Sequence, residues 1–121
     1  MDKKQIGYLG EEFVCRYLVK KGCEIKKRNF CIRGGEIDII AAKGTKLFFV
    51  EVKTRMPDPM VSAEAAITKR KKSLIIKTAR AYLHSLNEVY DCRFDVAVVT
   101  FDGERVVDFV YYDNAFDASD C

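Results

Sequence analysis

The sequence predicts an α/β protein in which helices flank a central mixed sheet of five strands. Two segments repeat apolar residues at helical spacing, and five shorter segments have the apolar runs or alternation of strands. Their order along the chain is helix, three strands, helix, two strands, which suits a sheet covered by helices. The chain has 121 residues, 49% of them hydrophobic and 32% charged, so we expect a single domain over residues 1–121.

The two helices are expected at Lys4 to Lys20 and at Ser62 to Leu86. In the first, apolar residues recur at steps of three and four, and Gly22 follows as a stop residue. In the second, Ser62 is the expected N-cap, and four consecutive cations occupy residues 69–72. Because four successive residues spread around a helix, at least one of these cations should lean toward the edge of the sheet.

The strands are separated by recognisable turn residues. Gly34-Gly35, Gly44 and Asp102-Gly103 each lie between two of them. Both prolines fall in residues 56–60, MPDPM, which we expect to form a mobile flap over a substrate, and the acidic residues 113–121 are expected to be a loosely ordered tail. The predicted strands are Cys23–Ile32, Glu36–Ala42, Lys46–Arg55, Arg93–Phe101 and Val106–Tyr112.

The second and third strands carry charged side chains inside apolar runs. Because side chains alternate along a strand, Glu36 and Asp38 should share one face of the second strand, and Glu51 and Lys53 one face of the third. The short hairpin would bring Asp38 close to Glu51. The opposite faces are expected to be apolar, with Ile37 and Ile39 in one strand and Phe48, Val50 and Val52 in the other.

Two carboxylates placed together repel each other unless a cation or a shared proton lies between them. A hard divalent ion such as Mg²⁺ is the natural occupant of a site formed by Asp38 and Glu51. Lys53 would then orient or polarise an attacking water or a phosphate oxygen. A structural hairpin with cross-strand salt bridges on a solvated face accounts for the same residues.

Three further acids have two interpretations each. Glu11 and Glu12 are neighbours on the first helix, so only one can readily face a shared site, and both would be solvated in an ordinary surface helix. Asp95 lies within the fourth strand, where it either supports the site or pairs with Arg93. We favour the pair, because buried acids are usually paired.

Positive charge is concentrated in the first two thirds of the chain. Residues 1–80 contain nineteen Lys or Arg and nine Asp or Glu, whereas residues 81–121 contain two and nine. This asymmetry predicts a surface that faces a polyanion such as DNA, although solvated faces also carry basic runs. The candidate nucleic-acid contacts are Arg28, Arg33, Arg55, Lys69, Arg70, Lys71 and Lys72.

Composition argues against a membrane protein or a disulfide framework. No apolar run approaches the ~18–20 residues of a membrane span, and the N-terminus has no apolar signal core, so we expect no membrane partner and a cytoplasmic location. Five cysteines show neither CxxC nor Cys/His spacing. We expect Cys15 in the core, Cys121 at a frayed end and His84 exposed on a helix.

Asp38, followed after twelve intervening residues by Glu51-x-Lys53, resembles the PD-(D/E)xK nuclease site. A second resemblance spans nearly the whole chain. The segments GYLGEEFVCRYL, KKRNF, GGEIDIIA, FFVEVKTR, the Lys-rich helix ending in ARAYL, and RFDVAVV resemble, in order, the motifs of the uncharacterised protein family UPF0102, also called the YraN family. Members of that family are similar in fold to archaeal Holliday-junction resolvases and are described as candidate endonucleases.

The family resemblance implies a restriction-endonuclease-like (resolvase-like) fold and roles for individual residues. Glu11, Asp38, Glu51 and Lys53 match the metal and catalytic positions of resolvases, and Lys71 matches a recurrent basic position. Glu36, in the GEID segment, is either a metal ligand or only a neighbour.

These roles give the leading hypothesis of a Mg²⁺- or Mn²⁺-dependent endonuclease that hydrolyses phosphodiesters of structured or branched DNA. Asp38, Glu51 and the main-chain carbonyl of Val52 would hold the ion, Glu11 would complete the cluster, and Lys53 would position the water. An exposed sheet edge would support a homodimer, as cutting two symmetric strands requires.

Two other functions remain open from the sequence. One is a non-catalytic DNA-binding or scaffolding module with salt-dependent affinity and no metal requirement. The other is a protein-interaction domain whose charged hairpin is purely structural.

Overall fold

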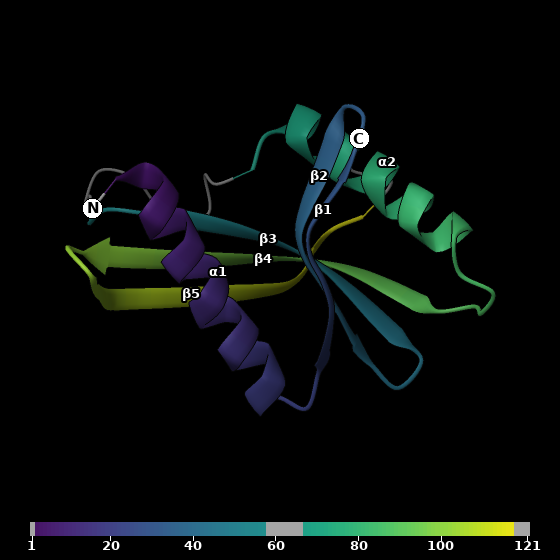
Figure 1. Ribbon diagram of the computed structural model, residues 1–121, viewed down its shortest axis with the longest axis horizontal. Helices are drawn as coiled ribbons and strands as arrows, with labels where there is room; N and C mark the ends of the chain where they lie inside the picture. Colours follow the sequence, from purple (N-terminus) through teal and green to yellow (C-terminus); the bar gives the residue numbers. More distant parts are fainter. Residues whose placement is uncertain (1, 58–66, 118–121) are drawn as a thin grey trace.

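In the computed structural model of the chain, residues 2–57 and 67–117 are described. Within these ranges the five strands form one sheet in chain order, with β3 and β4 parallel and the other neighbours antiparallel (Figure 1). The prediction of an α/β chain with a mixed five-stranded sheet and two helices is confirmed. The elements are α1 (Lys3–Lys20), β1 (Glu24–Ile32), β2 (Gly35–Lys43), β3 (Lys46–Arg55), α2 (Lys69–His84), β4 (Asp91–Asp102) and β5 (Arg105–Phe116).

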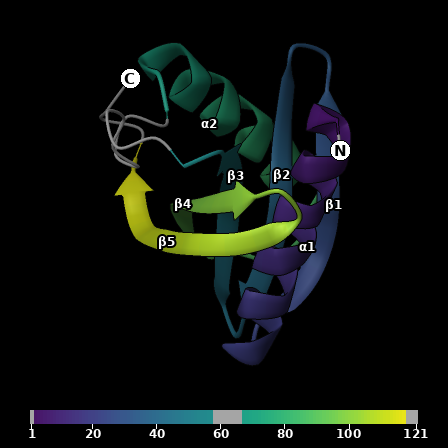
Figure 2. The same ribbon diagram turned by 90° about the vertical axis from the view of Figure 1, so that its left-hand side faces the viewer.

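Each helix covers a different face of the sheet (Figures 1 and 2). The apolar stripe of α1, including Val14 and Leu18, packs with Phe48 and Val50 of β3. The apolar side of α2 packs on the other face and forms a cluster with Ile37, Phe49 and Val98. The two buried clusters hold the sheet between the helices, so side chains from both helices can reach the same end of β2 and β3.

Close packing of α1 on the sheet depends on Gly10. A Cβ atom at this position would overlap Cγ2 of Thr54 on β3. Gly10→Ala should therefore destabilise the protein by about 1–3 kcal/mol in urea unfolding, because the helix must move away from the sheet. Gly7→Ala is the matched control: nothing lies within 4 Å of its Cβ position, so that change should stabilise the helix by about 0.5–1 kcal/mol. If Thr54→Ser fails to recover part of the loss in the Gly10→Ala protein, the steric explanation is wrong.

The second helix begins later than predicted. Thr68 has an extended backbone (φ −77°, ψ 160°), and its hydroxyl accepts a hydrogen bond from the N–H of Lys71 at 3.1 Å, so Thr68 is the N-cap and α2 starts at Lys69. The predicted start at Ser62 is wrong, and Ser62 itself lies outside the described residues. Serine and threonine cap helices by the same mechanism, so the type of residue at position 62 does not by itself fix where the helix begins.

The C-terminal part of the chain is more ordered than predicted. Strand β5 continues to Phe116, which is 3% exposed and stacks on Phe94 with ring centroids 5.2 Å apart. The expectation of a loose tail from Asp113 is therefore wrong for residues 113–116, because one aromatic ring anchors them to the α2-side core. Residues 118–121, including Cys121, and residues 58–60 of the predicted flap lie outside the described residues.

Several smaller expectations are confirmed. Cys15 is buried in the core, and His84 is exposed at the last residue of α2. None of the helices that the structure describes is both long and apolar enough to cross a membrane.

Candidate active site

Strands β2 and β3 separate at Asp38. Their backbone pairing runs from Lys43 opposite Lys46 to Ile39 opposite Val50 and goes no further. Beyond this point the Asp38 carboxylate accepts a hydrogen bond from the Val52 N–H, with Oδ2 and N 2.8 Å apart. Figure 1 shows β1 and β2 turning away from β3 toward α2. A side-chain oxygen thus takes the place of a β2 backbone acceptor for the Val52 N–H.

This separation breaks the side-chain alternation predicted for the second strand. Ile37 and Ile40 belong to the cluster on the α2 face, whereas Ile39 belongs to the cluster on the α1 face. The prediction that Ile37 and Ile39 share a face is therefore wrong. Strict period-two alternation holds only while a strand stays in a regular ladder, and β2 leaves its ladder with β3 at Asp38.

Asp38 and Glu51 form a pair of close carboxylates. Glu51 is 7% exposed, and its carboxyl group lies within hydrogen-bonding reach of Asp38. Burial, followed by the hydrogen bond and the negative charge of Glu51, raises the pKa of Asp38 to about 8, although the Val52 N–H acts in the opposite direction. Without a bound metal ion, the pair therefore retains a proton at neutral pH.

Lys71 supplies one cation to this pair from α2. Its Nζ lies 3.2 Å from Oε2 of Glu51, whose negative charge raises the pKa of Lys71. This contact confirms that one of the four consecutive cations leans toward the sheet. The helix dipole places partial positive charge at the first turn of α2, and that turn contains no acidic residue to offset it. The carboxylate of Glu51 supplies part of the missing negative charge.

Glu11 approaches the pair from α1, while Glu12 does not. The Glu11 carboxylate accepts a hydrogen bond from Nδ2 of Asn29 at 3.1 Å. Burial and the nearby charge of Asp38 raise the pKa of Glu11. Glu12 instead forms an ion pair with Arg28 at 2.8 Å. The prediction that only one of the two glutamates faces a shared site is confirmed.

Asn29 is a site residue that the sequence reasoning missed. Its side-chain amide donates to Glu11 and also to Glu36, at 3.1 and 3.3 Å, so it links β1, β2 and α1. Its backbone has a positive φ of 51°, a conformation that asparagine tolerates better than most residues. An asparagine inside a basic strand segment was the available signal.

The carboxylates fit a small oxygen-coordinated ion with few protein ligands. Among the described residues, no three His, Cys, Asp or Glu side chains come together as a group that could hold a metal ion. Mg²⁺ is often bound by only one or two carboxylates and keeps several waters, so the close pair Asp38 and Glu51 suits it. Participation of Glu11, and of the main-chain carbonyl of Val52, stays a prediction.

Lys53 follows Glu51 by two residues on β3 and is exposed. Within the described ranges its ammonium group has no ion-pair or hydrogen-bond partner. It is therefore available to an incoming anion, unlike Lys71, which already neutralises Glu51.

The predicted nucleic-acid contacts differ in their surroundings. Arg28 is bound to Glu12, and its guanidinium carbon lies 5.4 Å from the centroid of the Tyr8 ring. The Nζ of Lys72 lies 5.7 Å from the centroid of the Phe116 ring. The exposed cations of the predicted set are Arg33, Lys69, Arg70 and Lys71, and Arg55 is half-buried at the end of β3.

Asp95 pairs with Arg93, as we favoured. Arg93 donates to both of its carboxylate oxygens, at 2.9 and 3.0 Å, and the Tyr111 hydroxyl and the Asn114 N–H donate as well. Asp95 is fully buried, so these hydrogen bonds, and not water, stabilise its negative charge. Its contacts tie β4 to β5 and do not include the carboxylate pair.

Comparison with known proteins identifies the family. The model of the uncharacterised protein family UPF0102 matches residues 10–99, the part of the chain that contains the whole carboxylate site. The chain belongs to family UPF0102. A UPF0102 protein of Pelotomaculum thermopropionicum is 44% identical over 116 residues, 94% of this chain and 97% of that protein. Another, from Dictyoglomus thermophilum, is 36% identical over 118 residues, 96% of this chain and 100% of that protein.

The raised pKa of Asp38 predicts how the stability of this UPF0102 protein depends on pH without metal. The folded pKa of about 8 exceeds the ordinary value of 3.8, so between these limits the folded state holds a proton that the unfolded state has lost. The free energy of unfolding contributed by this group should therefore fall as pH rises from about 4 to about 8.

Urea unfolding in EDTA at pH 5 and pH 8 checks this dependence. Asp38→Asn should flatten the decline and stabilise the protein at pH 8 by about 1–2 kcal/mol, after discounting for solvent screening. Asp102→Asn, at an exposed turn, should leave the slope unchanged. A parallel decline in wild type and Asp38→Asn would show that another group is responsible.

Proposed function

We propose that this protein is a divalent-metal-dependent endodeoxyribonuclease that hydrolyses structured or branched DNA, with a resolvase-like version of its α/β fold. The observation that carries the proposal is the half-buried Asp38 beside buried Glu51 at the point where β2 and β3 separate, with exposed Lys53 two residues farther along β3. Carboxylates concentrated in this way cost stability, as the raised pKa of Asp38 indicates. Such a cost is typical of functional sites.

Different residues of the candidate site would have different roles in hydrolysis. Asp38 and Glu51 would hold Mg²⁺ or Mn²⁺, which supplies a water of lowered pKa and neutralises charge on the phosphate. Lys53 would hold the attacking water and offset the charge that grows on the phosphate oxygens. The water oxygen would bond to phosphorus and give up its proton to solvent as the bond to the 3′-oxygen breaks. The 3′-oxygen would take up a proton from solvent, which leaves a 5′-phosphate and a 3′-hydroxyl.

Basic residues beside the pair support a DNA substrate. Lys69 and Arg70 are exposed at the N-terminus of α2, and Lys71 joins that turn to Glu51. Free N–H groups, the helix dipole and the exposed cations Lys69 and Arg70 together favour a phosphate at this place. Arg33 lies exposed in the turn between β1 and β2 and would contact a second phosphate. A homodimer would allow both strands of a junction to be cut.

The test is cleavage of labelled duplex, flap, single-stranded and four-way-junction DNA in Mg²⁺ or Mn²⁺. We expect cutting of a branched substrate that EDTA abolishes and that ends in a 5′-phosphate. DNA binding without cutting, unaffected by substitution of Asp38 or Glu51, would instead identify a DNA-binding module.

A further inference from the structure

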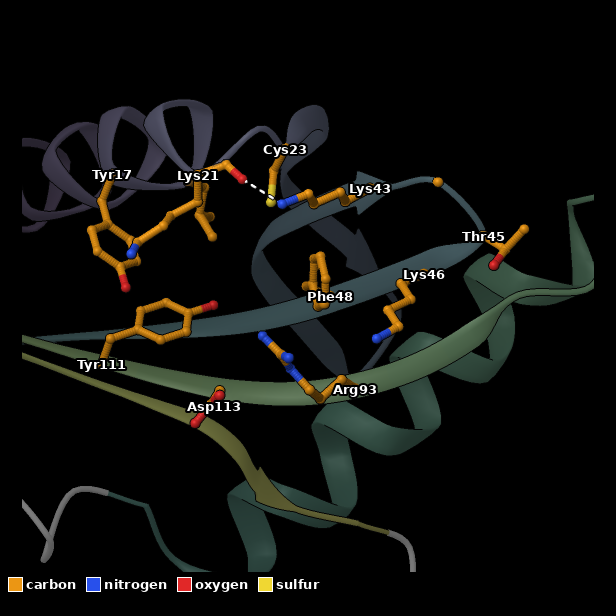
Figure 3. A pocket seen from close by; sticks show the side chains of 12 residues that line it. Tyr17, Lys21, Cys23, Lys43, Thr45, Lys46, Phe48, Arg93, Tyr111 and Asp113 are labelled. Atoms are coloured by element: carbon orange, nitrogen blue, oxygen red, sulfur yellow. Dashed lines mark hydrogen bonds between the residues drawn. The ribbon is translucent and has the colours of Figure 1, made fainter.

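A second binding site lies at the C-terminal end of α1, whereas Glu11 lies in the middle of that helix. A cavity of about 690 Å³ opens between the last turn of α1, the turn that joins β2 to β3, and the neighbouring strands β4 and β5 (Figure 3). Its volume falls within the range of small-molecule sites, roughly 300–1,000 Å³. None of the carboxylates of the candidate active site lines it.

Positive charge exceeds negative charge in the lining of the cavity. Lys21, Lys43 and Lys46 line it, and in the part of the chain that the structure describes none of them forms a salt bridge. Lys43 donates to the main-chain oxygen of Lys21 at 2.8 Å, a bond that caps α1 but leaves both ammonium charges in place (Figure 3). Asp113 is the acid among the lining residues. An anion would therefore gain from entering the cavity.

Aromatic rings form the remaining wall of the cavity. Tyr17 and Tyr111 are in contact, with ring centroids 5.0 Å apart, and both line it together with Phe48. The guanidinium carbon of Arg93 lies 4.4 Å from the Phe48 ring centroid, so one face of that ring is already covered. The Nζ of Lys21 lies 5.6 Å from the centroid of the Tyr17 ring. A nucleobase would stack on these tyrosine rings once this ammonium group turns to the phosphate, and such stacking is worth about 1–3 kcal/mol per base in known complexes.

We propose that this cavity binds one nucleotide unit, with its phosphate held by Lys21, Lys43 and Lys46 and its base against Tyr17 and Tyr111. The nucleotide is either a free mononucleotide or one residue of a DNA strand. Lys46 precedes Glu51 by five residues on β3, about 16 Å along an extended strand, so the phosphate here is not the one beside the carboxylates. The proposal does not depend on nuclease activity.

Binding is measured without metal, so that failure of the nuclease proposal leaves this test intact. In EDTA and low salt, dAMP, deoxyadenosine and inorganic phosphate are titrated into ¹⁵N-labelled protein and followed by NMR. We expect dAMP to shift the amide signals of lining residues and to bind more tightly than deoxyadenosine or phosphate. Deoxyadenosine lacks the phosphate, and inorganic phosphate lacks the base.

The variant Lys21→Gln/Lys46→Gln should weaken dAMP binding by about tenfold or more, because the loss of even one charge-assisted contact to the phosphate lowers affinity by roughly that factor. The matched control Lys20→Gln/Lys77→Gln removes two exposed lysines that do not line the cavity, and its affinity should equal that of wild type. Both variants change surface side chains, and their amide spectra report directly whether they are folded.

Three results would overturn the proposal: no shifts at the lining residues, equal loss in the two double variants, or equal affinity for dAMP and inorganic phosphate. A ten-nucleotide single strand then distinguishes the source of the nucleotide. If the strand displaces dAMP from the cavity at lower concentration than dAMP itself binds, the occupant is a DNA strand. If it does not, the occupant is a free nucleotide.

Discussion

Asp38→Asn is expected to lower the rate of DNA cleavage by about a thousandfold or more while the protein stays folded. The substitution keeps the shape of the side chain and an oxygen for the Val52 N–H, but it removes the charge shared with Glu51. A divalent ion then loses one of its anionic ligands, and the water loses its activation, which together are worth at least about 4 kcal/mol of the barrier. Single-turnover cleavage of a junction in Mg²⁺ measures the effect.

Glu51→Gln should cause a similar loss, and the two substitutions together should cost little more than either alone, because they remove parts of one unit. Asp102→Asn and Glu104→Gln are the controls, since both acids are exposed, Asp102 at the end of β4 and Glu104 in the turn that follows. Full activity in Asp38→Asn would remove Asp38 from the mechanism. Calorimetric titration with Mn²⁺ would then show whether it binds an ion at all.

Asp95→Ala is expected to reduce the free energy of unfolding by about 3–5 kcal/mol, because it leaves buried donors without a partner. Arg93, the Tyr111 hydroxyl and the Asn114 N–H all donate to this one carboxylate. The loss is a large share of the roughly 5–15 kcal/mol that stabilises a domain. Thermal unfolding or urea titration gives the measurement.

Asp95→Asn provides a milder form of the same test if the alanine variant does not fold. It keeps an acceptor but loses the charge, so it should destabilise the protein less. Below its unfolding temperature it should cleave DNA at the wild-type rate, since Asp95 does not contact the carboxylate pair. Asp91→Ala, exposed at the start of the same strand, should change neither property. A large loss of cleavage in folded Asp95→Asn would assign this residue to the site instead.

The strands and their order could be predicted from the sequence because their causes are local. Apolar periodicity and turn residues such as Gly44 and Gly103 determine the conformation of the residues close to them in the chain. From these two signals the bounds of β2 to β5 were predicted to within a few residues. The spacing of Asp38, Glu51 and Lys53 likewise depends on one hairpin. Their proximity therefore followed from local geometry, and the structure bears out the approach of Asp38 to Glu51.

Features that depend on packing between distant segments could not be predicted in this way. The sequence predicted Ser62 as the N-cap of the second helix, whereas α2 begins after Thr68 in the described part of the chain. Phe116 orders the end of β5 by stacking on a ring more than twenty positions earlier, Phe94. An acidic composition cannot reveal such an anchor.

The sequence by itself determined the α/β class, the order of the elements and the identity of the close acidic pair. Only the tertiary structure decided that β2 leaves β3 at Asp38, that Asn29 holds Glu11 beside Glu36, and that Lys71 reaches Glu51. Each of these contacts joins elements that are far apart in the chain. Their geometry is set by how two helices pack on opposite faces of one twisted sheet. A local pattern of residues does not encode the distances between elements that are far apart in the chain.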